Sequence, residues 1–338
     1  MDFTLRFWAE MIEPPAVVKR ALPLLVEYRA GVAVAVFAGS LNKKNAKAFR
    51  AILDAGVELA YWPLLDREDG YFPGESNVDT YAQLVGSVLD WAEKEDVTPD
   101  ALAIDLELPF GQMREVLDAE HPFARVKNAL SVMRGNLGRE RYLVAKDGLR
   151  ELNDSIQDRG VRTITAVLPW VALELEGEHE LIQDMTETPV AGIGWDLLSP
   201  MLYVSMLAGM TNGIVTEEDA NWLVYDACLK LRSRFGGRAG VSLGLTGSGV
   251  LEDEPTFDEP EGLLVGLRAA LAAGIRDVSI YNLEGVLDHD DPRVWFDAIR
   301  AAEPLVPAKS GMVARALFLA RHVYPPIARF AEWYRTPP

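Results

Sequence analysis

Two acidic residues, Asp105 and Glu107, stand in a short apolar stretch at residues 100–109. Alternate side chains of a strand point to opposite faces, so Asp105, Glu107 and Ala103 share one face of the strand that this stretch predicts. A carboxylate on the inner face of an apolar strand needs partners or a shifted pKa, so the pair indicates a site. When two carboxylates adjoin on a dry surface, one is held protonated near neutral pH, as an acid that donates to a leaving oxygen must be. A structural ion-pair network is the alternative for the same residues.

The elements that would position this pair alternate between strands and helices. Apolar runs predict eight strands, at residues 5–12, 31–38, 57–65, 100–109, 161–168, 197–206, 239–245 and 277–283. Amphipathic patterns predict the helices, at residues 16–28, 42–55, 78–94, 110–158, 217–235, 261–273 and 291–302. Such alternation, with near-continuous apolar strands, predicts a single α/β domain with the (β/α)8 TIM-barrel fold, because helices cover the outer face of every strand. Its active site should lie at the carboxyl ends of the strands, where Asp105 and Glu107 lie.

The charge and composition of the chain narrow the classes of partner. A net charge of −18 over 338 residues repels phosphates, so we expect no nucleic-acid partner and a neutral or cationic ligand instead. The sequence has one cysteine, Cys228, which lies in a helical pattern. A single cysteine allows no internal disulfide and no cysteine-based zinc site. No basic, apolar leader opens the sequence, and this predicts a cytoplasmic protein.

The last stretch departs from the barrel pattern. We expect the barrel to occupy residues 1–306 and a basic amphipathic helical tail to occupy residues 307–338. Residues 309–335 carry a charge of +4 against −22 for the remainder, and the helical pattern is interrupted at Pro325 and Pro326. We favour docking of this tail on the acidic barrel of its own chain, and a peripheral contact with a membrane surface is the alternative.

Five motifs stand in order between residues 100 and 284. The first comprises Asp100, Asp105 and Glu107, with Ala103 between them, and the others are residues 164–169, Met201-Leu202-Tyr203, residues 241–245 and residues 280–284. In this order they resemble the strand motifs of the chitinase-like glycoside hydrolases of family eighteen. The resemblance is that of a distant relative of the family. The family's fourth-strand motif is Asp-x-x-Asp-x-Asp-x-Glu, and Ala103 stands at its second aspartate. Val204 stands where the sixth-strand motif has an aspartate.

This resemblance implies a mechanism. It makes Glu107 the general acid and Asp105 its partner, which orients the acetamido group of the sugar, and it makes Tyr203 a hydrogen-bond donor to that group. The departures at Ala103 and Val204 put the acetamido-assisted route in question. The alternative is two-carboxylate hydrolysis, in which a gap of about 5 Å between the acids gives retention and roughly 6.5–9.5 Å gives inversion. The candidates for its second acid are Glu284, Glu10 and Asp66.

Sugar binding also needs flat apolar surfaces, which aromatic residues at strand ends supply. The substrate-binding candidates are the aromatic residues Trp8, Trp62, Tyr71, Trp170 and Tyr281 and the polar residues Glu10, Asp66 and Asn282. Core packing is the competing explanation for each aromatic residue, and it weighs least for Tyr71, which lies in a glycine- and proline-containing loop.

The sequence thus predicts a glycosidase that acts on an oligo- or polysaccharide with no metal and no cofactor. Two rival functions stay open. One is a catalytically inactive barrel that binds glycans, which the substitutions at Ala103 and Val204 favour. The other is a metal-dependent lyase or isomerase in which Asp105, Glu107 and Glu284 are ligands, since clustered acids suit magnesium or manganese.

Overall fold

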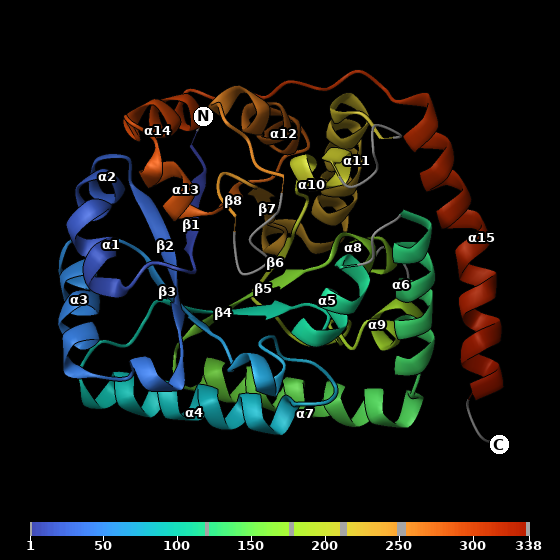
Figure 1. Cartoon of the computed structure of the whole chain (residues 1–338), viewed down its shortest axis with the longest axis horizontal. Coiled ribbons are helices and arrows are strands. Elements are labelled where there is room, and N and C mark those ends of the chain that lie inside the picture. The colour runs from blue at the N-terminus through green and yellow to red at the C-terminus, as the bar shows by residue number, and fades with distance from the viewer. Residues whose placement is uncertain (1, 119–121, 176–178, 210–214, 249–254, 336–338) are drawn as a thin grey trace.

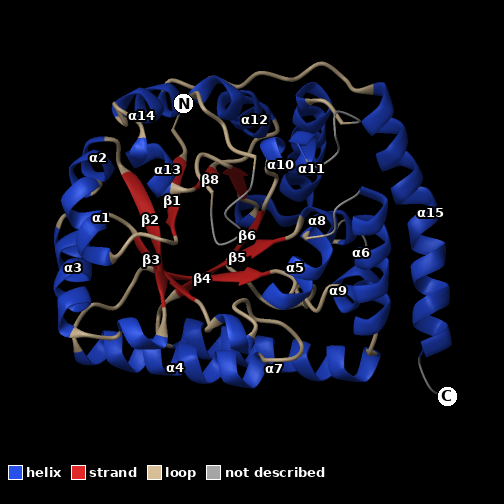
Figure 2. Cartoon of the chain, viewed as in Figure 1, coloured by secondary structure: helices blue, strands red, loops and turns tan. Residues whose placement is uncertain are grey.

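Eight parallel strands form a ring at the centre of the protein (Figure 1, Figure 2). The computed structural model describes residues 2–118, 122–175, 179–209, 215–248 and 255–335. The strands are β1 (Thr4–Ala9), β2 (Ala30–Val36), β3 (Leu59–Pro63), β4 (Ala101–Leu106), β5 (Arg162–Val167), β6 (Leu197–Pro200), β7 (Val241–Gly244) and β8 (Asp277–Tyr281). They pair in the order β6-β5-β4-β3-β2-β1-β8-β7. Parallel bridges from Leu198 to Ala239 and from Met201 to Ser242 join the two ends, so the barrel is nearly closed and the predicted (β/α)8 fold is confirmed.

Helices surround this ring (Figure 2). The first seven are α1 (Pro14–Arg20), α2 (Leu22–Glu27), α3 (Lys43–Asp54), α4 (Val78–Lys94), α5 (Phe110–Leu117), α6 (Pro122–Asn136) and α7 (Arg139–Asp158). The others are α8 (Pro169–Glu174), α9 (Leu181–Met185), α10 (Val204–Gly209), α11 (Glu217–Phe235), α12 (Pro260–Ala272), α13 (Leu283–Asp288), α14 (Arg293–Arg300) and α15 (Gly311–Arg335). Short 3-10 turns follow β2 and β3 as η1 (Ala38–Ser40) and η2 (Arg67–Asp69), and η3 (Gly236–Arg238) precedes β7.

Two predicted elements differ from those observed. The helix expected at residues 16–28 is divided into α1 and α2, because Pro23 lies in the first turn of α2 and cannot continue the hydrogen-bond ladder of α1. The strand expected to reach residue 206 ends at Pro200, and the chain then turns into α10. That prediction was wrong because the apolar run gave no sign of the change from strand to helix.

Side chains fill the barrel interior in layers. Near the amino ends of the strands, the buried Arg6 guanidinium contacts Glu58 at 2.6 Å and Asp277 at 3.0 Å. Above it, the indole rings of Trp8 and Trp62 pack edge to face with centroids 4.9 Å apart. This packing places the open end of the barrel above the two indoles, at the carboxyl ends of the strands, as in other barrels of this kind.

The tail forms one long helix, α15, that lies outside the ring and along one side of the molecule (Figure 1). The predicted interruption at Pro325 and Pro326 is wrong, since both prolines lie inside α15. The barrel holds the helix next to this point, because Arg321 pairs with Asp226 and the Tyr324 hydroxyl donates to Glu174. These contacts offset the two backbone hydrogen bonds that the prolines cannot make.

Candidate active site

Glu10 follows β1 directly and points into the open end of the barrel. Its side chain is buried, and each of its carboxylate oxygens accepts a hydrogen bond from a phenol. The Tyr71 hydroxyl donates to Oε1 at 2.7 Å, and the Tyr281 hydroxyl, at the end of β8, donates to Oε2. Hydrogen bonds received on both oxygens favour the ionised form of a carboxylate, so this geometry suits a fixed negative charge.

The loop after β3 brings Tyr71 to Glu10. The Tyr71 carbonyl accepts from the Leu65 amide at 3.0 Å, and the Gly70 carbonyl accepts from the Phe110 amide at 3.0 Å, which fixes the loop against α5. Tyr71 itself has a φ of 65°, a left-handed conformation that costs energy for a tyrosine. Strain of this kind persists where the surroundings impose it, and it is concentrated at functional sites.

A second set of contacts anchors the same loop farther along. Glu75 is buried, and its Oε2 accepts from Arg141 Nε of α7 at 2.9 Å. Its amide donates to the Glu187 carbonyl at 3.2 Å. Burial raises the pKa of Glu75 to about 8, with Asp184 and Glu187 adding to the rise against the Arg141 contact. These contacts are local to the loop and the helix layer, so we assign them a positioning role.

Asp105 lies at the end of β4 on the inner face of the barrel. It is 4% exposed, and its Oδ1 atom has no hydrogen-bond partner among the described residues. Burial raises its pKa to about 8, the negative charge of Glu10 adds to the rise, and a hydrogen bond with the Glu107 side chain acts in the opposite direction. Glu107 is half-buried and therefore lies nearer to solvent than Asp105. The two acids thus form a hydrogen-bonded pair in which burial and the charge of Glu10 favour the protonated form of Asp105.

Glu284, in the first turn of α13, holds the segment that follows Glu10. Its Oε1 accepts from the Met11 amide at 2.5 Å and from the Ile12 amide at 3.1 Å. Burial raises its pKa to about 7, and the nearby Glu10 charge contributes to that rise against the two backbone hydrogen bonds. Glu10 therefore influences the protonation of Asp105 and of Glu284, although the three residues come from three different strand ends.

An open pocket of about 660 Å³ reaches Glu10 from the surface. Its volume is within the range of about 300–1,000 Å³ that small-molecule sites occupy. Glu10, Tyr71, Asp66 and Arg67 line it on the β1 and β3 sides. The β2 side supplies residues that the sequence interpretation missed, namely Phe37, Ser40, Asn42 and Lys44. Their position after the carboxyl end of a strand was a usable signal, because that end of every strand faces the same rim.

The remaining predicted site residues lie at three levels. Trp8 and Trp62 are buried in the interior, each 2% exposed, and the Trp8 indole donates to Ser242 at 3.2 Å. Tyr203 is half-buried and stacks on Tyr281 with centroids 5.8 Å apart. Trp170 is 38% exposed at the start of α8. A sugar-binding role for these residues stays a prediction.

Asn282 has contacts that explain its presence without a substrate. Its Oδ1 accepts from the Gly285 amide at 2.8 Å as the cap of α13, and its Nδ2 donates to the Gly247 carbonyl at 3.2 Å. The turn at Gly247 approaches Gly285 so closely that a Cβ on Gly247 would lie 2.6 Å from the Gly285 Cα. These contacts do not test the predicted substrate contact of Asn282, which stays a prediction.

The acids of the site do not form a metal-binding group. Within the described ranges, no three Asp, Glu, His or Cys side chains come together as a metal ion would require. The raised pKa of Asp105, its hydrogen bond with Glu107 and the phenol contacts of Glu10 suit proton transfer beside a negative charge.

The fold is similar to that of known carbohydrate-active barrels. The glycoside hydrolase domain of PgaB (BpsB) from Bordetella bronchiseptica superposes with a TM-score of 0.51 at 11% identity, over 92% of this chain and 100% of that one. Saccharomyces cerevisiae Gas2p in complex with laminaritriose and laminaritetraose gives a TM-score of 0.50 at 10% identity, over 94% of this chain and 67% of that one. No protein-family model and no curated protein sequence matches the chain. At these identities the similarity establishes a shared barrel fold, and it adds no family match to the resemblance with family eighteen.

Proposed function

We propose that this protein is a glycoside hydrolase that acts on an oligo- or polysaccharide, with Glu107 as general acid and Asp105 as its partner. The observation that carries the proposal is the hydrogen-bonded pair of buried Asp105 and half-buried Glu107, with the pKa of Asp105 raised to about 8, near the phenol-bound Glu10. Structures with a similar barrel include a glycoside hydrolase domain and a protein that binds laminari-oligosaccharides, which supports a carbohydrate ligand.

The chemistry assigns one task to each acid. Glu107, the less buried of the pair, donates its proton to the glycosidic oxygen as the bond to the anomeric carbon breaks. Asp105 shares that proton beforehand and keeps it available at neutral pH. Glu10 supplies the negative charge that stabilises the positive charge developing on the sugar ring. Because Tyr71 and Tyr281 already hold this carboxylate in place, little reorganisation is needed during the reaction.

The position of Glu10 supports one of the two routes that the sequence left open. The resemblance to family eighteen implies attack by an acetamido group oriented by Asp105, whereas a carboxylate at Glu10 allows the two-carboxylate route without an acetamido group. We favour the second route, because Ala103 and Val204 leave the family's acid set incomplete. The anomeric form of the first product, observed by proton NMR, separates nucleophilic attack by Glu10 (retention) from activation of water by Glu10 (inversion).

The decisive experiment measures turnover and binding together. Wild-type protein is assayed on a panel of aryl glycosides and oligosaccharides, and binding of the best oligosaccharide is measured for wild type, Glu107→Gln and Glu10→Gln. We expect both variants to bind the sugar and to lose turnover. Glu151→Gln, at an exposed position on α7 outside the pocket, is the matched control and should keep full activity.

Other outcomes favour the rival functions. Binding without turnover in the wild-type protein would indicate a glycan-binding barrel. Turnover that EDTA abolishes and magnesium or manganese restores would favour the metal-dependent enzyme and contradict the assignment of Glu107 as a proton donor.

A further inference from the structure

The outer face of α15 is apolar although it has no partner within the described part of the chain. Met312, Leu319, Val323 and Ile327 are between 45% and 57% exposed. Their spacing of seven, four and four residues places them on one side of the helix. Phe318, 58% exposed, lies on the adjoining side of the helix, where its ring stacks on that of His322 with centroids 4.0 Å apart. We call these five side chains the outer face of α15.

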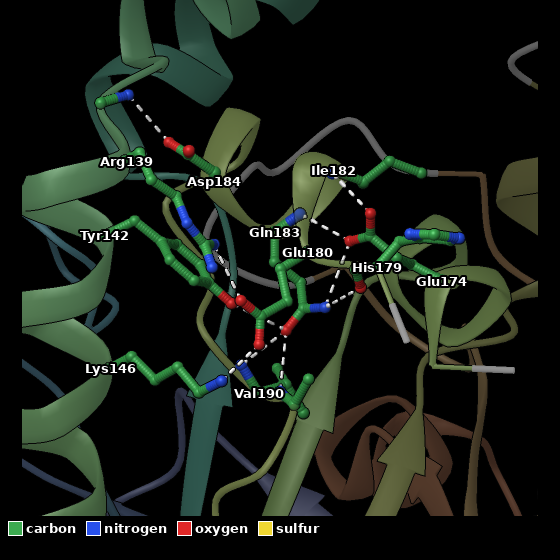
Figure 3. Close-up of polar contacts among 12 residues, drawn as sticks. Arg139, Tyr142, Lys146, Glu174, His179, Glu180, Ile182, Gln183, Asp184 and Val190 are labelled. Carbon is green, nitrogen blue, oxygen red and sulfur yellow. Dashed lines mark hydrogen bonds and ion pairs between the residues drawn. The ribbon is translucent and has the colours of Figure 1, made fainter. Parts of the chain in front are cut away.

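The opposite side of α15 is already occupied by the barrel. Val313, Leu317 and Ala328 are buried there, and Ser310 contacts Asp219 of α11. Tyr324 donates to Glu174, whose carboxylate also accepts from the Ile182 and Gln183 amides at 2.9 Å each. Figure 3 shows the Glu174 carboxylate with its hydrogen bonds to Ile182 and Gln183. The helix is therefore fixed in one rotation, and the outer face cannot turn inward without breaking these contacts.

Positive charge runs along one edge of the outer face. Arg315 and Arg329 are exposed, and residues 309–329 contain no aspartate or glutamate. On a helix these two positions fall on the same edge, about four turns apart, beside the apolar stripe. A protein with a net charge of −18 thus presents a basic, apolar strip at one border of the molecule (Figure 1).

A shallow hollow adds to this surface near the start of α15. It has a volume of about 520 Å³ and is lined by Lys309, Gly311, Ala314, Arg315, Phe318 and Leu319. Lys309 and Arg315 border an apolar floor there. This arrangement would fit a lipid whose anionic headgroup lies above its acyl chains.

We propose that the outer face of α15 binds an anionic lipid surface, with the helix lying flat in the membrane interface. The apolar stripe would enter the boundary between headgroups and acyl chains, while the arginines reach the phosphates with their long side chains. The helix would not cross the bilayer, since none of the helices in the described ranges has the length and apolar character for a membrane span.

A second copy of the chain is a poorer occupant. An antiparallel pairing of two α15 helices through their outer faces would bring the basic edges of both copies together, and like charges oppose such contact. Other exposed large apolar residues, such as Met11, Val144 and Val294, are scattered over different elements and offer no matching stripe. A lipid surface can bind the outer face of α15 without a matching apolar stripe. It also leaves the pocket open, because α1 and α3 lie across the molecule from α15 in Figure 1.

Vesicle co-sedimentation of the full chain tests this proposal. We expect binding to phosphatidylglycerol-containing vesicles, much weaker binding to pure phosphatidylcholine, and loss of binding in about 0.5 M NaCl. Leu319→Asp with Val323→Asp should reduce the partition coefficient more than about tenfold. Leu143→Asp with Val144→Asp, an exposed pair on α7, is the matched control and should leave binding unchanged.

Charge-reversal variants provide a second, independent test of vesicle binding. Each basic residue near an anionic surface contributes about fivefold to binding, so Arg315→Glu with Arg329→Glu should reduce it at least about 25-fold. Lys43→Glu with Lys47→Glu on α3, exposed on the far side, should have little effect. Circular dichroism melting verifies that each variant is folded. Absence of binding to anionic vesicles, equal losses in the control pairs, or a wild-type dimer that the α15 variants dissociate would each overturn the proposal.

Discussion

Replacing Asp105 by asparagine tests the electrostatic account of the site without a substrate. Asparagine keeps the size of the side chain but cannot ionise, so Asp105→Asn removes the cost of a buried negative charge beside Glu10. The pKa of Asp105 is raised from 3.8 to about 8. An acid whose pKa rises on folding stabilises the protein below its unfolded pKa, and this stabilisation is lost as the pH rises through the folded pKa. The wild type should therefore lose stability between about pH 4 and pH 8, and the variant should lose much less.

The size of the effect follows from the shift. A difference of about four pKa units corresponds to roughly 5 kcal/mol, as an upper bound on the change in relative stability over this pH range. With an unfolding entropy of about 2.1 cal/mol/K per residue, that energy corresponds to a change of about 7 °C in the Tm difference for a chain of this length. The absolute Tm difference at low pH is less informative, because the amide introduces donors that the buried site does not satisfy.

The assay is a series of thermal melts of wild type and Asp105→Asn from about pH 4 to pH 9, followed by circular dichroism. Asp154→Asn, at an exposed position on α7, serves as the control for general effects of charge and should show a small Tm difference that varies little with pH. We expect the Tm of Asp105→Asn to rise steadily relative to the Tm of the wild type as the pH rises. A Tm difference that is independent of pH, or that turns against the variant at high pH, would refute the reasoning, since it would mean that Asp105 is ionised and stabilised by partners.

Three further predictions concern the other acids. Glu107→Gln should lower turnover on oligosaccharides by about 10²–10⁴-fold and much less on aryl glycosides with good leaving groups, which need little protonation; equal losses on both would contradict its role as the acid. Glu10→Gln should lower the pKa of Asp105 below about 8, measured by carbon-13 NMR titration, because it removes the second-largest cause of the rise. Glu284→Gln keeps the acceptor for the Met11 amide but cannot ionise. Because the pKa of Glu284 is raised to about 7, the wild type loses stability as the pH rises to this value. The variant should therefore be as stable as the wild type at low pH and more stable above about pH 7. Denaturation by urea at two pH values tests the last prediction, and a variant that is less stable at the higher pH would count against it.

The barrel could be predicted from the sequence because each strand is both apolar and followed by an amphipathic helix. The boundaries of α4 and α11 were predicted as observed, since their patterns are long and regular. Strand alternation predicted a shared face for Asp105 and Glu107, but β4 ends at Leu106, so Glu107 lies just beyond the strand, where its side chain forms a hydrogen bond with Asp105. The sequence did not show which elements meet in space, so the contact between Glu10 after β1, Tyr71 after β3 and Tyr281 of β8 came only from the structure.

Tyr71 illustrates why such contacts escape a reading of the sequence. Tyr71 was predicted as a substrate-binding candidate, and it does line the pocket. The direction of its phenol depends on the left-handed backbone at this residue and on the amide contacts of Leu65 and Phe110. A non-glycine residue at positive φ is imposed by tertiary surroundings, so local propensity gives no indication of it.

The register of the strands explains how the large residues of this site fit inside an eight-stranded ring. Trp8 pairs in register with Ala33, and Trp62 pairs with Ala35, so each indole has an alanine beside it on β2. Residues paired in a parallel sheet point to the same face, and a barrel interior of this size has room for one large side chain at each such place. The alternating alanines of β2 thus leave space for the two indoles, which fill the barrel interior and are each 2% exposed. Burial is the largest cause of the raised pKa of Asp105. The alanines of β2, which carry no functional group, therefore contribute to the site through the packing of the interior that they allow.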